Sequence, residues 1–150
     1  PTNKPTLREW QPPQLFDKDE ERDQKLLVLV QGLLQEKQSI LIVCQDDAAV
    51  KALQQKWSNL GFPDNVIFYT NDSNRTSEDI FEQKRQKERN AKGEKIAGSL
   101  VVASCLSRGD NPDVDHVIIL DLTDENDIGQ KGGRVGRFGK KGTVHQLYSK

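Results

Sequence analysis

A glycine-rich block near the end of the chain carries the residue types that bind phosphate. Residues 130–137 read Gln-Lys-Gly-Gly-Arg-Val-Gly-Arg, so Arg134 and Arg137 stand three residues apart and follow Gln130. A guanidinium group keeps its charge and can donate to two phosphate oxygens at once, and glycines let a phosphate approach the backbone. The spacing predicts a phosphate contact. A solvated basic loop, or one that touches nucleic acid, is the alternative.

A second polar block follows an apolar run. Residues 100–104 read Leu-Val-Val-Ala-Ser, and Arg108, Gly109 and Asp110 come shortly after them. A continuous apolar run of this length is typical of a strand buried on both faces, and the polar residues then occupy the loop at its end. The same residues fit a simple Asp-Asn-Pro turn equally well, because Asp and Asn favour turns.

Both blocks resemble motifs of superfamily 2 helicases and translocases. The block at 130–137 is similar to motif VI, whose arginines reach across a cleft to the terminal phosphate of an ATP held by a neighbouring RecA-like domain. The block at 100–112 is similar to motif V, although it is one residue shorter after Ser104. The resemblance implies that Arg134 and Arg137 are catalytic arginine fingers. It implies that the nucleotide-binding residues are Gln130, Gly133, Gly136, Arg108, Gly109 and Asp110.

Three further segments resemble the second nucleotide-binding domain of SecA, the preprotein translocase ATPase. The chain opens with Pro-Thr-Asn-Lys-Pro at residues 1–5, has Ile128-Gly129-Gln130 before the arginines, and has Leu147-Tyr148 near its end. These segments occur in the order of that family and span nearly the whole chain, with the weakest match at 71–98.

The resemblance to SecA implies a function, cofactors and partners. The chain would be the second motor domain of an ATP-driven protein translocase, with ATP and Mg²⁺ bound mainly by a first motor domain of the same polypeptide. The other partners would be an unfolded polypeptide and a membrane translocon, and nucleic acid is the less favoured partner. The implied location is the cytoplasm, with peripheral contact to the inner membrane.

The groups that an ATPase needs in order to hold its own nucleotide are missing. A P-loop reads G-x-x-x-x-G-K-[ST], and the nearest approach, at Gly139-Lys140, has Arg134 in the first glycine position and Lys141 in the last. Asp46 and Asp47 follow an apolar run and could imitate a magnesium-binding pair, but a helix cap explains them more simply. We therefore expect no metal site and no ATP hydrolysis by this chain alone.

Composition narrows the class of protein. The chain has 150 residues and a formal net charge of −1, a size that fits about one domain. Residues 110–127 hold seven carboxylates and no Lys or Arg, whereas residues 131–150 hold six basic residues and no carboxylate. A local basic block fits one phosphate partner better than general nucleic-acid binding. Cys44 and Cys105 adjoin apolar runs, which indicates buried, reduced thiols.

No apolar run approaches the length of a membrane span, and no signal peptide is visible. The chain contains no methionine, and we interpret it as a piece of a longer protein.

Apolar patterning predicts strands that alternate with helices. Residues 1–16 are expected to form an extended entry segment, a linker or a strand along an edge, and residues 17–150 one RecA-like domain. A capping box of Asp17 and Glu20 is expected to start the first helix. We expect strands at 39–44, 66–69, 100–104 and 116–121, an edge strand at 143–148, and helices from 17, from 46 and over 76–95. The last helix has few apolar residues and is expected to be solvated.

This alternation predicts a three-layer α/β domain, with a mainly parallel sheet covered by helices on both faces. Function in such sheets lies in the loops at the carboxyl ends of the strands, here after Cys44, Ser104 and Asp121. Two alternatives remain. A nucleic-acid helicase would use Ser104 where the family often has a Thr that touches the strand. A catalytically silent RecA-like module would only bind partners.

Overall fold

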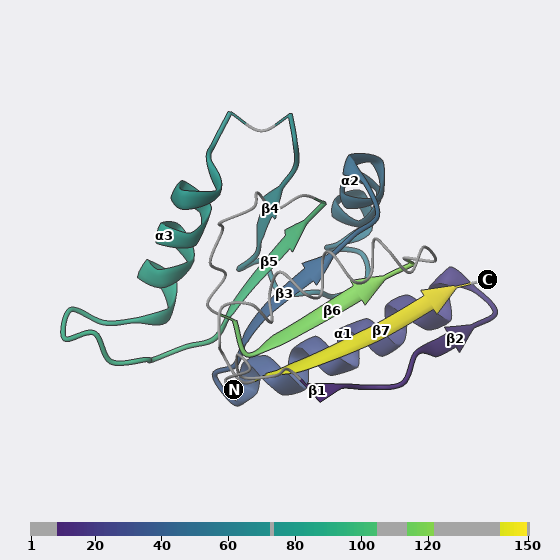
Figure 1. Cartoon of the computed structure of the whole chain (residues 1–150), viewed down its shortest axis with the longest axis horizontal. Coiled ribbons are helices and arrows are strands. Elements are labelled where there is room, and N and C mark those ends of the chain that lie inside the picture. The colour runs from purple at the N-terminus through teal and green to yellow at the C-terminus, as the bar shows by residue number, and fades with distance from the viewer. Residues whose placement is uncertain (1–8, 73, 105–113, 122–141, 150) are drawn as a thin grey trace, which may run out of the picture.

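A computed structural model describes residues 9–72, 74–104, 114–121 and 142–149 (Figure 1). In chain order the elements are β1 (Glu9–Trp10), β2 (Gln14–Phe16), α1 (Asp19–Gln35), β3 (Ser39–Val43), α2 (Asp47–Lys56), β4 (Ile67–Tyr69), α3 (Ser77–Glu88), β5 (Ser99–Ala103), β6 (His116–Leu120) and β7 (Thr143–Ser149).

The strands form one sheet in which every pair is parallel. The order is β1-β7-β6-β3-β5-β4, and β2 also pairs with β7. The central strand β3 is flanked by β5, with Ser39 opposite Ser99, and by β6, with Ile40 opposite His116. All carboxyl ends of the strands therefore meet at one edge of the sheet, and all amino ends at the other.

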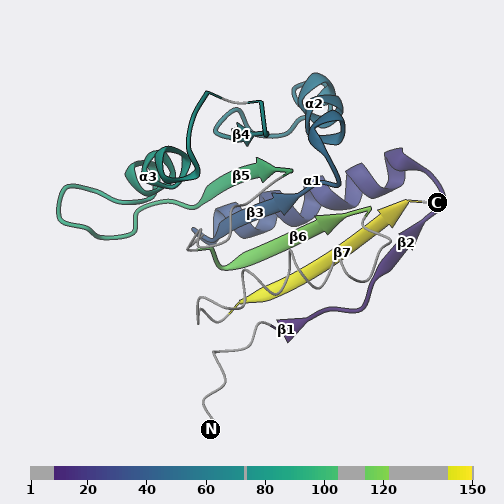
Figure 2. The same ribbon diagram turned by 45° about the horizontal axis from the view of Figure 1, so that its top comes forward.

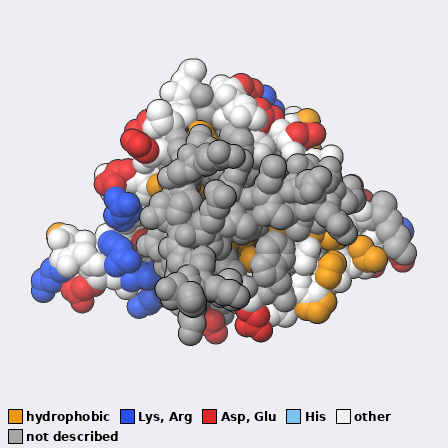
Figure 3. All heavy atoms as spheres, viewed as in Figure 1, with side chains coloured by type: hydrophobic (Ala, Val, Ile, Leu, Met, Phe, Trp, Pro, Cys, Tyr) orange, Lys and Arg blue, Asp and Glu red, His pale blue; other side chains and the backbone are white. Residues whose placement is uncertain are grey.

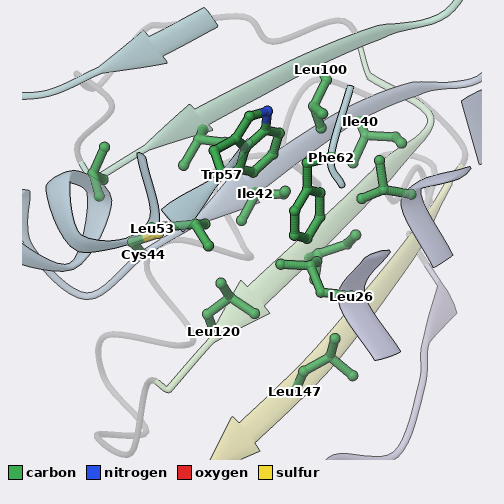
Figure 4. Packing of buried hydrophobic residues seen from close by; sticks show 14 residues of the cluster. Leu26, Ile40, Ile42, Cys44, Leu53, Trp57, Phe62, Leu100, Leu120 and Leu147 are labelled. Carbon is green, nitrogen blue, oxygen red and sulfur yellow. The ribbon is translucent and has the colours of Figure 1, made fainter. Parts of the chain in front are cut away.

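Continuous apolar runs fill the centre of the sheet, because both of its faces are covered. Every residue of β3 and of β5 is buried. One side of the sheet packs against α1 and α2 through Leu26, Val50 and Trp57. Figure 4 shows this core, in which Trp57 and Phe62 stack with their ring centres 4.2 Å apart. The other side of the sheet packs against Ile80 of α3.

Helices thus lie on both faces of a parallel sheet, which confirms the predicted α/β three-layer class. Figure 1 shows α1 running behind β6 and β7. The two cores place α1 and α2 on one face of the sheet and α3 on the other. Consecutive apolar residues of one strand serve opposite cores, as Leu41 and Ile42 do. That division explains why the strand runs show no polar alternation.

The beginning of α1 differs from the prediction. Its N-cap is Lys18, whose side chain makes no capping hydrogen bond, so the predicted capping box of Asp17 and Glu20 is wrong. Three carboxylates in the first turn, Asp19, Glu20 and Glu21, instead face the positive end of the helix dipole.

The edge-strand prediction for β7 is also wrong. β7 pairs with β6 on one side and with both β1 and β2 on the other. Figure 2 shows these two short strands following one another along β7. The expectation of a strand packed along an edge is confirmed for residues 9–16, whereas residues 1–8 lie outside the described part of the chain.

The third helix is shorter and more firmly anchored than its charged sequence indicates. It ends at Glu88, and Thr76 caps it in a capping box with Asp79. Lys84 and Glu88 are 3% and 2% exposed and form an ion pair. The Glu88 carboxylate also accepts hydrogen bonds from Ser39 Oγ, at 2.9 Å, and Ser99 Oγ, at 2.6 Å. The expectation of a solvated helix is therefore wrong on the face toward the sheet.

Two backbone segments touch where the chain enters β3 and β5. A Cβ built on Gly98 would lie 2.2 Å from the carbonyl oxygen of Gln38, far inside any real contact. Gly98 directly precedes Ser99, and Gln38 directly precedes Ser39, so only glycine allows the two strands to start side by side.

Candidate functional site

The residues predicted to contact nucleotide lie outside the described part of the chain. Two segments contain all of them, 105–113 and 122–141. The residues concerned are Arg108, Gly109, Asp110, Gln130, Gly133, Arg134, Gly136 and Arg137. Cys105 lies in the first of these segments, whereas Cys44 is buried, as predicted.

The described residues nevertheless fix where both segments leave the sheet. The first begins after Ser104, at the carboxyl end of β5, and the second begins after Asp121, at the carboxyl end of β6. In the register of the sheet, Val43 of β3 lies between Ala103 and Ile119. Both segments therefore start at the same edge, on either side of β3, as the positions of the strand ends predicted.

Asp47, at the start of α2, contacts the ends of two strands at this edge. Its Oδ1 accepts a hydrogen bond from the Ser104 hydroxyl and another, at 3.1 Å, from the backbone N–H of Asn71. The bond from Ser104, and after it the bond from Asn71, lower the pKa of the Asp47 carboxyl below its ordinary value. Asp47 is thus held as a carboxylate that ties α2 to the ends of β4 and β5.

Asp46 is a helix cap, which was the simpler of the two interpretations. Its Oδ1 accepts from Ala49 N at 2.8 Å, and its backbone is extended, as an N-cap requires. Across the described ranges, no three His, Cys, Asp or Glu side chains gather closely enough to hold a metal ion.

A charged network crosses the edge near the end of β6. Arg22, only 8% exposed, donates through Nη2 to Asp23 Oδ1 at 2.9 Å and through Nη1 to the Asp121 carboxylate. Burial opposes the charge of Arg22, but the hydrogen bond and the charge of Asp23, with that of Asp121, outweigh it and raise the pKa of the guanidinium. Lys56 Nζ completes the group, 2.6 Å from Asp23 Oδ2.

Asp121 itself has an unusual backbone. Its φ is +55°, in the left-handed region that few residues other than glycine adopt. Its Oδ1 accepts from Ser149 N at 2.7 Å, and its other carboxylate oxygen binds Arg22. These contacts hold Asp121 in place, directly before the arginine-bearing segment begins.

A cavity of about 190 Å³ opens beside this network. Its lining combines apolar side chains with both signs of charge, Arg22 and Lys56 beside Asp19 and Asp121. It lies beside the carboxyl ends of the neighbouring strands β3 and β6. After β3 the chain adds β4 and β5 on one side of the sheet, whereas after β6 it adds β7 on the other side. Parallel α/β sheets commonly place ligands at such a switch point.

The sequence interpretation missed Arg22, Asp23 and Lys56. A signal was present, because Arg22 precedes the buried Leu26 and Val30 by four and eight residues and so shares their face of α1. A charged residue on the apolar face of a helix indicates a buried partner, although the sequence does not show which partner.

Within the described ranges, every helix is too short or too polar to cross a lipid bilayer. In comparisons with known proteins, no family model and no curated protein matches this chain.

Proposed function

We propose that this chain is the second motor domain of a SecA-like ATP-driven protein translocase. Two features support the proposal: the parallel three-layer α/β fold, and the edge of the sheet from which both motif-bearing segments leave. The second feature carries it. Residues 105–113 and 122–141 are far apart in sequence, yet they start from strands that both neighbour β3.

The proposed mechanism divides the work between two domains. A first motor domain with a P-loop would hold ATP and Mg²⁺. ATP would supply the phosphoryl group, and Mg²⁺ would neutralise negative charge on the phosphates. Arg134 and Arg137 stabilise the charge that develops on the transferring phosphoryl group, and Gln130 orients groups around it. Gly133 and Gly136 let the phosphates come close to the backbone. Arg108, Gly109 and Asp110 contact the nucleotide from the segment that follows β5.

The chemistry of the described edge agrees with a metal ion held by the other domain. Asp46 is used as a helix cap, and Asp47 is used to tie Ser104 and Asn71. Both carboxylates of the pair that could imitate magnesium ligands therefore have structural roles, which supports this division of work.

A nucleic-acid helicase is the first alternative. In it Ser104 would touch the strand, but the Ser104 hydroxyl donates to Asp47 and the residue is only 6% exposed. On the described part of the face in Figure 3, Lys and Arg side chains gather beside α3, close to Asp and Glu side chains. Mixed charge suits water better than a polyanion. The silent module, the second alternative, would show no ATPase activity in any context.

The arginines provide the direct test. In a protein that joins this chain to a P-loop domain, Arg137→Ala or Arg134→Ala is expected to lower the rate of ATP hydrolysis by about 10³-fold or more while ATP binding is largely kept. Arg85→Ala is the matched control, because Arg85 is exposed and pairs only locally with Glu82. A finger variant within about threefold of wild type, ~0.7 kcal/mol in barrier, contradicts the proposal.

Two further measurements separate the alternatives. The chain alone is expected to release no phosphate from ATP, since it lacks a P-loop; steady release that Arg134→Ala abolishes would contradict this. In the joined protein, unfolded polypeptide is expected to stimulate hydrolysis, and single-stranded DNA or RNA to bind weakly, with few phosphate contacts in its salt dependence. Stimulation by nucleic acid alone would favour the helicase.

A translocase of this kind works in the cytoplasm at the inner membrane, beside a translocon.

A further inference from the structure

The chain has only two histidines, and the fold brings them together. His116 begins β6 and His145 lies in the middle of β7, and both are partly buried. They are 29 residues apart in sequence, and Nδ1 of His116 lies 3.1 Å from Nε2 of His145. The pairing of β6 with β7, in which Ile118 lies opposite His145, places the two rings diagonally on one face.

The rings meet edge to edge. Their planes differ by only 20°, and their centres are 5.3 Å apart. The distance between the ring centres is close to the sum of the N···N distance and the radii of the two rings. The two nitrogens therefore lie almost on the line that joins the ring centres and point at one another. The arrangement is an in-line N–H···N hydrogen bond between two imidazoles.

Counting protons shows how this bond responds to acid. A neutral imidazole has one donor and one acceptor, so a neutral pair makes the bond with one hydrogen between the rings. A first added proton can occupy an outer nitrogen and leaves the bond intact. A second proton puts hydrogens on both inner nitrogens, which removes the acceptor and places two positive charges side by side.

The surroundings oppose the second proton. Burial, then His116, then Lys25 of α1 lower the pKa of His145 to about 4. On the other side of β7, Glu9 of β1 pairs with Thr143 and is exposed. A histidine whose folded-state pKa lies below 6.5 contributes stability above that pH, and the contribution is lost as the pH falls toward 4.

We propose that His116 and His145 form an acid-sensitive latch between β6 and β7. The latch is closed at neutral pH and opens when both imidazoles are protonated. Because β1 and β2 pair with the far side of β7, opening loosens that whole edge of the sheet and leaves β3, β4 and β5 in place. The latch does not depend on the proposed ATPase role.

The two histidines can be followed individually because the chain contains no others. In a pH titration by NMR, His145 is expected to titrate near pH 4, as the second step of one coupled pair. Amide exchange in β7 should speed up with the second step, before β3 loses protection. Two rings that both titrate near pH 6.5 without any change in β7 overturn the latch.

Variants give an independent readout. His145→Gln and His116→Gln keep a polar side chain but cannot acquire a charge, so each should lower the pH at which β7 protection is lost by ~0.5 unit or more. Lys25→Gln removes the nearby cation, keeps both imidazoles, and should raise the pKa of His145. Unchanged acid sensitivity in both histidine variants overturns the proposal, even if one of them is less stable at neutral pH.

Discussion

Two lysine–carboxylate pairs lie at opposite edges of the sheet, and they differ in how far they are buried. Lys84 and Glu88 lie at the amino edge, with both side chains 3% exposed. Lys51 and Asp72 lie near the carboxyl edge, with side chains 52% and 57% exposed. The first pair is surrounded by strand starts and by the hydroxyls of Ser39 and Ser99, whereas the second is in contact with water.

The two edges also differ in what their charged groups contact. At the amino edge, Asp115 accepts from Ser39 N at 2.9 Å and from Lys95 Nζ at 2.8 Å, so charges there bind backbone and each other. At the carboxyl edge, the charges surround a cavity and flank the starts of two segments with candidate motifs. The candidate motifs thus begin at the edge where parallel sheets in general place their chemistry, whereas the contacts at the amino edge join strand starts to one another.

The largest effect is expected from breaking the buried pair. Glu88→Ala leaves the Lys84 ammonium buried without this carboxylate and deprives both serine hydroxyls of their acceptor, which costs about 3–5 kcal/mol of unfolding free energy. Urea unfolding measures the loss. The double variant Lys84→Met/Glu88→Leu removes both charges and should recover much of the stability. If the double variant were as unstable as the single one, the buried charge would not be the cause.

The next largest effect is steric and lies at the same edge. Gly98→Ala places a Cβ against the Gln38 carbonyl, which is backbone and cannot turn aside, so we expect a loss of about 2–3 kcal/mol. Gly32→Ala is the matched control, since a Cβ at this position near the end of α1 meets nothing within 4 Å, and it should stabilise by ~0.5 kcal/mol. Equal effects of the two substitutions would argue against the close approach.

A smaller effect is expected at the carboxyl edge from the helix cap. Asp46→Ala removes the acceptor for Ala49 N and should lower the unfolding free energy by ~1 kcal/mol. Asp46→Asn retains a good capping oxygen and should be nearly neutral. Thermal unfolding of the two variants beside wild type checks this, and a large loss with Asn would indicate that the charge of Asp46 has another role.

The smallest effect is expected from the exposed pair. Asp72→Ala breaks the contact with Lys51, but solvent screens both groups, so unfolding in urea should match wild type within error. The bonds from Lys51 and then Thr70 lower the pKa of the Asp72 carboxyl, so any contribution it makes is present at neutral pH and lost in acid. A loss at neutral pH as large as that of Glu88→Ala would remove the distinction between the two edges.

Patterns within short stretches of sequence predicted much of the fold. The stretches 40–44, 100–103 and 117–120 are apolar without interruption, and β3, β5 and β6 lie within one residue of the strands predicted at 39–44, 100–104 and 116–121. Asp46 could be predicted as a cap because a capping side chain acts three residues away on its own helix. The carboxyl ends of β5 and β6 could be located from these runs, and so could the edge of the sheet at which the candidate motifs begin.

What could not be predicted depends on residues distant in sequence. The Lys84–Glu88 spacing is also found on solvated helices, and only the packing of α3 against Ser39 and Ser99 buries the pair. The far side of β7 is covered by residues 9–16, more than a hundred positions earlier. The predicted nucleotide residues stay a prediction, because they lie outside the described ranges.

The pairing of β1 and β2 with β7 has a consequence for how copies of this chain meet. A bare strand edge is a template onto which a second molecule can add its own strand, and such pairing leads to aggregates. The entry segment occupies that template on β7, the longest strand of the described sheet, while the opposite edge ends in the three-residue β4. By covering the edge of β7, residues 9–16 therefore oppose strand pairing between copies of the chain as well as completing the sheet.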